Sequence, residues 1–203
     1  IFLTSIDKEG TKKGFDVRAV RPPTVPSGTA RLRIVCHAHH TLEQLEGLAD
    51  AIAEEAKKVK FGDGLDPSSD YGPVNNKMQF EKLVDLIEDT KRSGAKILTG
   101  GDMPDRRGYY VNPTVVVDID DDARLVQEEQ FGPVLPILKF GDQEDAIRRA
   151  NDTRFGLSGS VWTNNLEKGE EIASRLEVGT ARVNQHLGIS PDIPFGGAKG
   201  GLL

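Results

Sequence analysis

One stretch of the sequence, Gln127–Phe140, constrains the fold more than any other because it joins a turn signal to an apolar run. Gly132-Pro133 is a dipeptide typical of turns. Val134–Phe140 is an apolar run with β-branched and aromatic residues towards its ends, a pattern that predicts a buried strand. Glu129 and Phe131 therefore lie just before a strand, and a loop held by a rigid strand is a usual place for binding groups.

A carboxylate beside an aromatic ring suits a ligand that carries both hydroxyl groups and a flat heterocycle. Glu129 would accept hydrogen bonds from ribose hydroxyls, and Phe131 would pack against the heterocycle. The alternative is that Glu128 and Glu129 are solvated and that Phe131 belongs to the core. The residues of this stretch alone leave both interpretations open.

Four landmarks along the chain follow the order of motifs found in one enzyme family. They are Glu129–Val134 (E-Q-F-G-P-V), Asn151–Ser158 (N-D-T-R-F-G-L-S), Gly179–Asn184 (G-T-A-R-V-N) and Pro194–Lys199 (P-F-G-G-A-K). Over residues 54–203 the sequence therefore resembles the C-terminal part of the catalytic domain of the NAD(P)-dependent aldehyde dehydrogenases.

The resemblance implies a coenzyme, a substrate and a role for several residues. In the family, the glutamate of the first motif holds the nicotinamide ribose and the phenylalanine lies beside the nicotinamide, and these positions correspond to Glu129 and Phe131. Phe195 and Ile189 would line the aldehyde pocket, with Asn184 nearby. The implied coenzyme is NAD or NADP, and the implied substrate is a small-molecule aldehyde.

Composition narrows the class of protein. A hydrophobic content of 37% and a charged content of 29% describe a globular chain, and a net charge of −6 argues against nucleic acid or an anionic membrane as a partner. The N-terminus resembles no signal peptide and carries no starting Met, as expected of a fragment. The single Cys36 excludes an internal disulfide and favours a reducing, cytoplasmic location.

The first 53 residues show a second resemblance. Gly14–Val20 and Ala30–Cys36 are predicted to form a short antiparallel strand pair around the Pro-rich loop Arg21–Gly28. This segment resembles the C-terminal domain of the amino-oxononanoate synthases, in which the position of Arg21 reaches the substrate carboxylate. The lysine that binds pyridoxal phosphate in that family belongs to a domain with no counterpart in these residues, so we predict no pyridoxal phosphate. The two resemblances predict a domain boundary between residues 1–53 and 54–203. They also predict that the chain is a chimera or a fragment.

Apolar periodicity predicts an α/β fold. Phe80, Leu83, Val84 and Ile87 recur at three- and four-residue spacing, as expected on the inward face of a helix. The predicted helices are Thr41–Val59, Asn76–Arg92, Gln143–Ala150 and Leu166–Leu176, and the predicted strands are Ala95–Leu98, Tyr110–Ile119, Val134–Phe140, Gly159–Thr163 and Thr180–Asn184. This order favours a layered domain with a largely parallel sheet, like that of the aldehyde dehydrogenase catalytic domain.

The family's reaction needs a thiolate that attacks the aldehyde, and Cys36 is the only thiol. The family's nucleophile segment would fall about where the Pro-rich loop Arg21–Gly28 lies, and Cys36 instead lies within a predicted strand. Its neighbour His37 would point to the opposite strand face. We therefore predict a buried structural Cys36, no assigned catalytic residue and no metal site.

The function best supported by these patterns is aldehyde oxidation with NAD(P), by a chain that is inactive in isolation because the nucleophile segment and a Rossmann domain have no counterpart in it. One alternative is a non-catalytic chimeric or engineered α/β chain. Another is a fragment of a pyridoxal-phosphate amino-oxononanoate synthase. An uncovered sheet edge also predicts a homo-oligomer or a missing partner domain.

Overall fold

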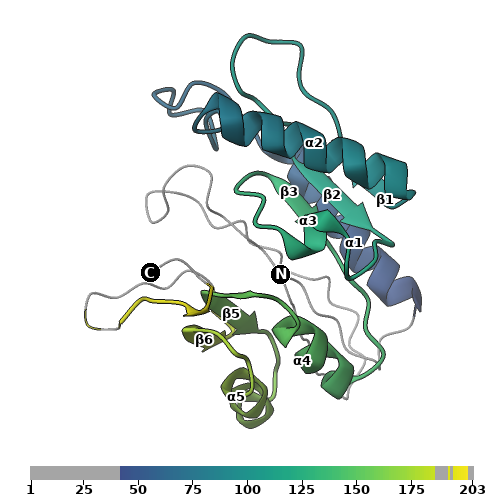
Figure 1. Ribbon diagram of the computed structural model, residues 1–203, viewed down its shortest axis with the longest axis vertical. Helices are drawn as coiled ribbons and strands as arrows, with labels where there is room; N and C mark the ends of the chain where they lie inside the picture. Colours follow the sequence, from purple (N-terminus) through teal and green to yellow (C-terminus); the bar gives the residue numbers. More distant parts are fainter. Residues whose placement is uncertain (1–41, 186–191, 193, 201–203) are drawn as a thin grey trace. The chain divides into compact units, whose positions relative to one another are not determined.

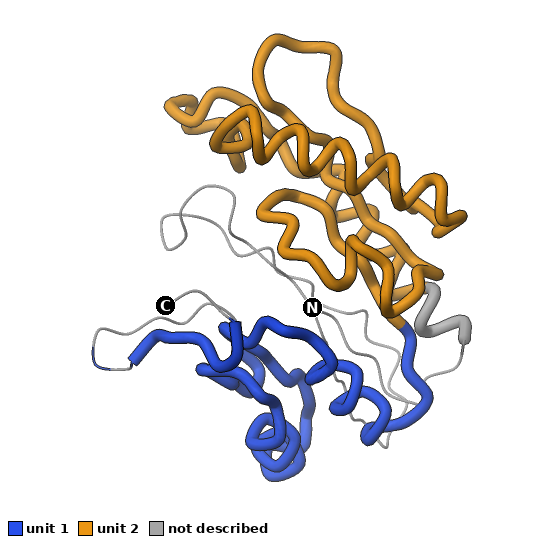
Figure 2. Tube along the Cα trace, viewed as in Figure 1, with its two compact units in different colours: residues 1–14, 32–45, 139–203 blue, residues 15–31, 46–138 orange. Residues whose placement is uncertain are grey.

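The computed structural model describes residues 42–185, 192 and 194–200. The chain divides into two compact units, shown in blue and orange in Figure 2. Unit 1 comprises residues 1–14, 32–45 and 139–203, and unit 2 comprises residues 15–31 and 46–138. The predicted strands Gly14–Val20 and Ala30–Cys36 and the loop Arg21–Gly28 lie outside the described residues.

Helices and strands are interspersed along the described residues (Figure 1). The helices are α1 (Leu42–Lys58), α2 (Lys77–Ser93), α3 (Arg124–Gln127), α4 (Gln143–Asn151) and α5 (Leu166–Ser174). The strands are β1 (Lys96–Thr99), β2 (Thr114–Val117), β3 (Val134–Pro136), β4 (Phe155–Gly156), β5 (Ser158–Val161), β6 (Thr180–Val183) and β7 (Ala198–Lys199).

The ends of helix α2 follow from its local sequence. Asn76 lies at the N-cap, and its side-chain Oδ1 accepts a hydrogen bond from the backbone N–H of Gln79 at 2.9 Å. Gly94 ends the helix in the left-handed conformation at φ 83°, which glycine adopts without steric penalty. Both ends lie within one residue of the predicted ones.

Unit 2 is built on a three-stranded sheet with the order β1-β2-β3. Strand β1 pairs with β2 antiparallel, and β2 pairs with β3 parallel, with Thr114 opposite Val134. Every residue of β2 is buried, as expected of a central strand covered on both faces. Strand β2 is therefore the central, buried strand of unit 2.

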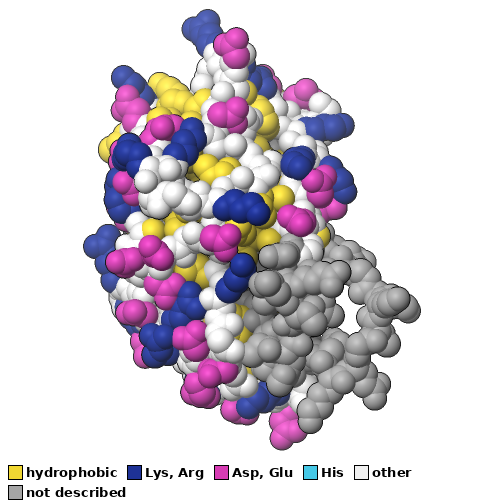
Figure 3. Space-filling model, turned by 90° about the vertical axis from the view of Figure 1, so that its right-hand side faces the viewer, with side chains coloured by type: hydrophobic (Ala, Val, Ile, Leu, Met, Phe, Trp, Pro, Cys, Tyr) yellow, Lys and Arg dark blue, Asp and Glu magenta, His cyan; other side chains and the backbone are white. Residues whose placement is uncertain are grey.

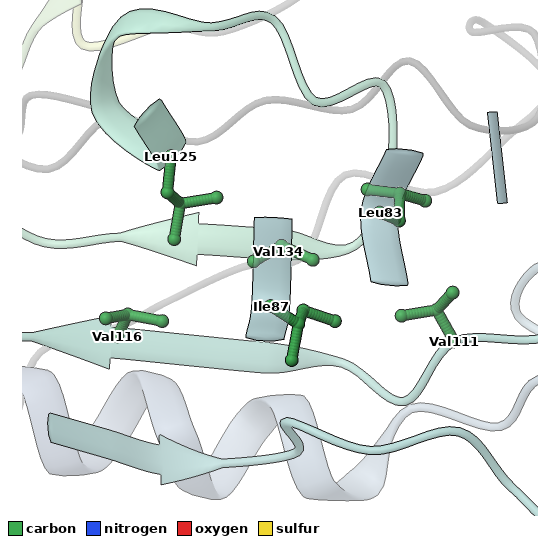
Figure 4. Close-up of a cluster of buried hydrophobic side chains, with 6 residues drawn as sticks. All are labelled: Leu83, Ile87, Val111, Val116, Leu125 and Val134. Atoms are coloured by element: carbon green, nitrogen blue, oxygen red, sulfur yellow. The ribbon is translucent and has the colours of Figure 1, made fainter. Parts of the chain in front are cut away.

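The core of unit 2 lies between α2 and the sheet. Figure 4 shows Leu83 and Ile87 of α2 beside Val116 of β2 and Val134 of β3. The six buried residues of this cluster are Leu83, Ile87, Val111, Val116, Leu125 and Val134. Burying an aliphatic side chain of this size stabilises a fold by roughly 1.5–3 kcal/mol, so this cluster holds α2 on the sheet.

Among its described residues, unit 1 contains two strand pairs. Strands β5 and β6 pair in parallel, and β4 and β7 pair antiparallel. The buried residues Ile147, Val161, Ile172 and Ala173 join α4 and α5 to this layer. Both helices begin at a side-chain cap, because the side chain of Asp142 accepts from the N–H of Asp145 and that of Asn165 accepts from the N–H of Lys168.

The predicted α/β class is confirmed, but the strand pairing is more mixed than a largely parallel sheet. Two of the pairs are parallel, β2–β3 and β5–β6, and two are antiparallel, β1–β2 and β4–β7. The predicted strand Val134–Phe140 is shorter in the structure and spans Val134–Pro136. The predicted strand Tyr110–Ile119 ends at Val117, since Asp118 has a φ of 52°. Val84 is half-buried, whereas Leu86 is buried.

Two surface properties of the described residues bear on partners. No helix among them combines the length and the apolar composition needed to cross a bilayer. Acidic and basic side chains are interspersed on the face shown in Figure 3. On that face the charge pattern is therefore mixed rather than of a single sign.

Leu83→Ala should lower the free energy of unfolding by about 2–5 kcal/mol, because the side chain is 0% exposed and its loss leaves a cavity in the core. Leu65→Ala is the matched control, since Leu65 is 93% exposed in the same unit. Urea denaturation monitored by circular dichroism gives both values. Equal losses from the two variants would contradict this assignment of the core.

Candidate functional site

The loop Glu128–Pro133 joins α3 to β3 and carries the first family landmark. It begins where α3 ends, with the N–H of Glu128 donating to the carbonyl of Arg124 at 2.8 Å. It ends in the sheet, where the N–H of Thr114 donates to the carbonyl of Pro133 at 2.8 Å. Both ends of the loop are therefore tied to regular secondary structure.

Helix α2 also holds the middle of this loop. The ammonium of Lys82 donates to the carbonyl of Glu129 at 2.8 Å, and the side-chain amide of Gln79 donates to the carbonyl of Gln130 at 2.5 Å. The side-chain amide of Gln130 in turn donates to the carbonyl of Val134 at 2.8 Å. Two successive carbonyls thus accept from one turn of α2, which fixes the path of the main chain.

Phe131 and Gly132 show how closely the loop is seated. Phe131 is half-buried and has a φ of 44°, which is uncommon for a residue other than glycine. A Cβ added to Gly132 would lie 2.4 Å from a methyl group of the core residue Leu83. A side chain at this position would displace Leu83, so the loop packs directly on the core of unit 2.

Glu128, the first carboxylate of the loop, lies beside two basic side chains. Glu128 accepts from the guanidinium of Arg124 at 2.8 Å and lies 3.5 Å from the ammonium of Lys82, while Arg124 also pairs with Asp85 at 2.8 Å. The hydrogen bond from Arg124 lowers the pKa of Glu128 against the opposing effect of partial burial, and the charges of Arg124 and Lys82 act in the same direction. Glu128 therefore joins α3 to α2, and the neighbouring Glu129 is half-buried.

Asn184, which follows β6, hydrogen-bonds to the backbone at the end of the neighbouring strand β5. Its side-chain oxygen accepts from the N–H of Thr163 at 2.7 Å, and its side-chain amide donates to the carbonyl of Thr163 at 2.7 Å. Its own N–H donates to the carbonyl of Val161 at 2.8 Å, and its φ is 53°. The hydrogen bonds of this side chain thus take the place of further strand pairing and fix the turn after β5.

The three landmarks of unit 1 converge in space. Phe155 of the second landmark pairs with Lys199 of the fourth, in the register of β4 and β7. Gly179 of the third landmark donates its N–H to the carbonyl of Gly156 at 2.9 Å. A Cβ on Gly179 would lie 1.7 Å from the carbonyl oxygen of Gly196, so the third and fourth landmarks touch through their backbones.

The predicted site residues fall in both units. Glu129 and Phe131 belong to unit 2, and Asn184 and Phe195 belong to unit 1. Phe195 is 48% exposed, so its ring presents an apolar surface to solvent. Ile189 and Cys36 lie outside the described residues. Among the described residues, no group of three or more His, Cys, Asp or Glu side chains could hold a metal ion.

A family model described as the aldehyde dehydrogenase family matches residues 29–202. The chain belongs to the aldehyde dehydrogenase family. The predicted family is therefore confirmed. The match begins at residue 29, so the family likeness extends further towards the N-terminus than the predicted start at residue 54.

Curated relatives and solved structures agree with this family. The chain is 44% identical over 146 residues to aldehyde dehydrogenase 1A1 of Bos taurus, a match that covers 72% of this chain and 29% of that protein. It is 45% identical over 146 residues to retinaldehyde dehydrogenase 3 of Rattus norvegicus, covering 72% of this chain and 28% of that protein. The chain thus spans less than a third of the length of the curated relatives it matches.

The fold is similar to that of solved aldehyde dehydrogenases. An NAD⁺ complex of the aldehyde dehydrogenase from Bacillus cereus superposes with a TM-score of 0.77 at 37% identity, covering 82% of this chain and 33% of that chain. The betaine aldehyde dehydrogenase of Staphylococcus aureus, also with NAD⁺, gives a TM-score of 0.76 at 33% identity, again covering 82% and 33%.

The sequence did not reveal the residues that hold the candidate coenzyme loop. Lys82 contacts a residue 47 positions away and Gln79 one 51 positions away, and neither belongs to a landmark. Their spacing of one helical turn is a weak signal, because the same spacing occurs on any solvated helix face. Arg124 was likewise missed, although it lies four residues before Glu128, a spacing that allows opposite charges to pair.

Glu128→Gln should lower the free energy of unfolding at pH 7 by roughly 0.5–1 kcal/mol, because the partners of Glu128 are partly solvated. The folded-state pKa is lowered, so the stabilisation is present above the unfolded value of about 4.3 and is lost as the pH falls through the folded value. The difference between wild type and variant should therefore vanish in acid. Urea denaturation from pH 7 to pH 3 measures it.

Glu81→Gln is the control for this experiment, because Glu81 makes an exposed ion pair with Lys77 at 3.5 Å on the same helix as Lys82. Its effect should be near zero at every pH. A loss from Glu128→Gln that is the same at pH 7 and pH 3 would show that the ion pair is not its source.

Proposed function

We propose that this chain forms part of an NAD(P)-dependent aldehyde dehydrogenase, which oxidises an aldehyde to a carboxylic acid. The observation that carries the proposal is the loop Glu128–Pro133, which has the family motif and is held on α2 at two successive carbonyls. A loop fixed in this way presents its side chains without first being ordered by the ligand, which favours binding. The chain would contribute the loop that faces the nicotinamide.

The side chains of this loop fit one end of the coenzyme. Glu129 would accept hydrogen bonds from the nicotinamide ribose, and Phe131 would lie against the nicotinamide ring. Both are half-buried, so each keeps a surface for a ligand. When bound, NAD(P) accepts a hydride from the substrate carbon. The NAD⁺ complexes of the two solved relatives support this choice of coenzyme.

The aldehyde pocket would take residues from unit 1. Phe195 offers an apolar wall, and Ile189 would lie at the second pocket-lining position of the family. The side-chain amide of Asn184 accepts from the N–H of Thr163 through its oxygen and donates to the carbonyl of Thr163 through its nitrogen. We therefore assign Asn184 the task of fixing the strand ends near the pocket, rather than that of reaching the aldehyde.

A second interpretation concerns residues 1–53. Their resemblance to the amino-oxononanoate synthases supports a domain boundary near residue 53 and a chimeric chain, which would be a non-catalytic α/β protein or a fragment of a pyridoxal-phosphate enzyme. The family match from residue 29 onward favours the aldehyde dehydrogenase instead. The resemblance remains a sequence-based proposal, as do a cytoplasmic location and a structural Cys36.

The strand edges of unit 2 support association. Among the described residues, β1 pairs only with β2, which leaves one edge of the three-stranded sheet without a described partner strand. An unpaired edge exposes backbone N–H and C=O groups that pair readily with another chain. We propose that a second copy of the chain, or a further domain, covers this edge.

The isolated chain should bind NAD⁺ with a dissociation constant of about 1 mM or weaker, because Glu129 and Phe131 contact only the nicotinamide end. Saturation-transfer NMR should show stronger transfer to the nicotinamide and its ribose protons than to the adenine protons. Glu129→Ala should abolish that transfer, and Glu81→Ala, on the exposed face of α2, should preserve it. No aldehyde-dependent NAD(P)H formation is expected from these 203 residues.

Three outcomes would contradict parts of this proposal. Equal transfer in wild type and Glu129→Ala would remove Glu129 from the coenzyme site. Complete absence of transfer in wild type would favour the non-catalytic interpretation. Aldehyde oxidation that Cys36→Ser abolishes would show that the chain is active alone and that Cys36 is not merely structural.

Multi-angle light scattering of the 203-residue chain should give a mass above that of the 22.1 kDa monomer, increasing with concentration. A charge placed in the exposed edge should reduce this association, so Leu98→Lys in β1 is the test variant, and Lys168→Met in α5 is the control. A monomer mass at every concentration would show that the edge of β1 is already covered within the chain.

A further inference from the structure

Lys199 lies where three segments of unit 1 meet. It belongs to β7 and is opposite Phe155 of β4. Its ammonium donates to the carbonyl of Asn151 at 2.5 Å and pairs with the carboxylate of Glu177 at 2.5 Å. The Lys199 side chain is 25% exposed and that of Glu177 is 59% exposed. One cation therefore joins β7 to the end of α4 and to the turn that precedes β6.

The carbonyl of Asn151 is a favourable acceptor for this cation. Asn151 is the last residue of α4, and the last carbonyls of a helix have no partner within the helix. They also carry the negative end of the helix dipole, which favours a positive charge nearby. The carbonyl of Asn151 accepts from the N–H of Thr153 at 2.9 Å, and Lys199, 48 residues away, is its second donor.

The side chain of Asn151 completes the junction. Its oxygen accepts from the N–H of Glu177 at 2.9 Å, and its amide donates to the carbonyl of Arg175 at 2.9 Å. The backbone adds a further contact, since the N–H of Gly200 donates to the carbonyl of Arg154 at 2.8 Å. The end of α4, the turn after α5 and strand β7 are thus hydrogen-bonded to one another.

The backbone of Lys199 indicates that its side chain has a task of its own. Its φ of 58° lies in the left-handed region, where a residue with a Cβ is less stable than glycine by about 1–2 kcal/mol. Glycine occupies Gly196, Gly197 and Gly200 in the same segment but not this position. The hydrogen bond and the ion pair of the ammonium act against the cost of this backbone conformation.

The same segment carries Phe195. Gly196 passes so close to Gly179 that a Cβ on Gly179 would lie 1.7 Å from the carbonyl oxygen of Gly196. The strand pair of β4 and β7 fixes the segment two residues further on, at Ala198 and Lys199. The position of Phe195 therefore depends on how firmly the residues that follow it are held.

We propose that Lys199 is a positioning residue for Phe195. By joining β7 to the carbonyl of Asn151 and the carboxylate of Glu177, its ammonium fixes the segment that carries the ring of Phe195. The role of that ring as a wall of the aldehyde pocket rests on the proposed function, whereas the junction itself does not. An ordinary solvated ion pair contributes at most about 1 kcal/mol and would not order a neighbouring loop.

The experiment measures ¹⁵N relaxation and amide hydrogen exchange of the full chain without ligand. In wild type the order parameter of the Phe195 amide should be near 0.85, and in Lys199→Met it should fall below about 0.6. Exchange of the Gly200 amide, which donates to Arg154, should accelerate about tenfold. Exchange of the Asn184 amide, which donates to Val161, should change less than twofold. Lys199→Arg should restore most of the order, because it keeps the charge.

Two further variants separate positioning from general stability. Lys199→Gly relieves the left-handed backbone and removes the ammonium, so its unfolding midpoint should equal or exceed that of Lys199→Met while Phe195 stays disordered. Lys168→Met removes a surface ion pair with Glu171 at 2.7 Å in the same unit and should leave Phe195 unchanged.

An unchanged order parameter of Phe195 in Lys199→Met and Lys199→Gly would overturn the proposal. Equal acceleration at Gly200 and Asn184 would also overturn it, since Lys199 would then affect only global stability. These readouts need no coenzyme or aldehyde, so a failed NAD⁺ experiment would refute the proposed function and leave this inference standing, and the reverse also holds.

Discussion

The close approach of Gly132 to Leu83 is the contact on which unit 2 depends. Leu83 is fully buried between α2 and the sheet, and a Cβ at position 132 would lie 2.4 Å from one of its methyl groups. Leu83 therefore belongs to the core and also contacts the candidate coenzyme loop. From the same helix, Gln79 and Lys82 bind the loop's carbonyls, so packing and hydrogen bonding fix Glu129 and Phe131 together.

Close approaches of glycine also hold unit 1 together, but here the glycines contact backbone carbonyls rather than a large side chain. Gly156 and Gly179 each lie too close to a carbonyl oxygen to carry a Cβ. Asn151 and Asn184 use both ends of their amide groups to bind backbone atoms of other segments. The family landmarks of this unit are thus largely the residues that let three segments meet, and the ring of Phe195 is carried on one of them.

The elements that were predicted correctly are those specified by residues within their own segment. Helix α2 was predicted to within one residue, because Asn76, Gly94 and the apolar spacing all lie in the segment itself. Strands β4 and β7 were missed, since each is only two residues long and exists only because the other lies beside it. The mixed strand pairing was also not predicted, because pairing direction depends on how distant segments approach one another.

For the candidate site, the family, the α/β class and the positions of Glu129, Phe131, Asn184 and Phe195 could be predicted from the sequence, because motif residues are adjacent along the chain. The contacts of those residues could not be predicted and are known from the structure alone. It placed Glu128 in an ion pair with Arg124 and committed the amide of Asn184 to Thr163. It also brought Lys199 to a helix end 48 positions away. Such partners are set by packing between distant segments, and no local pattern in the chain specifies them.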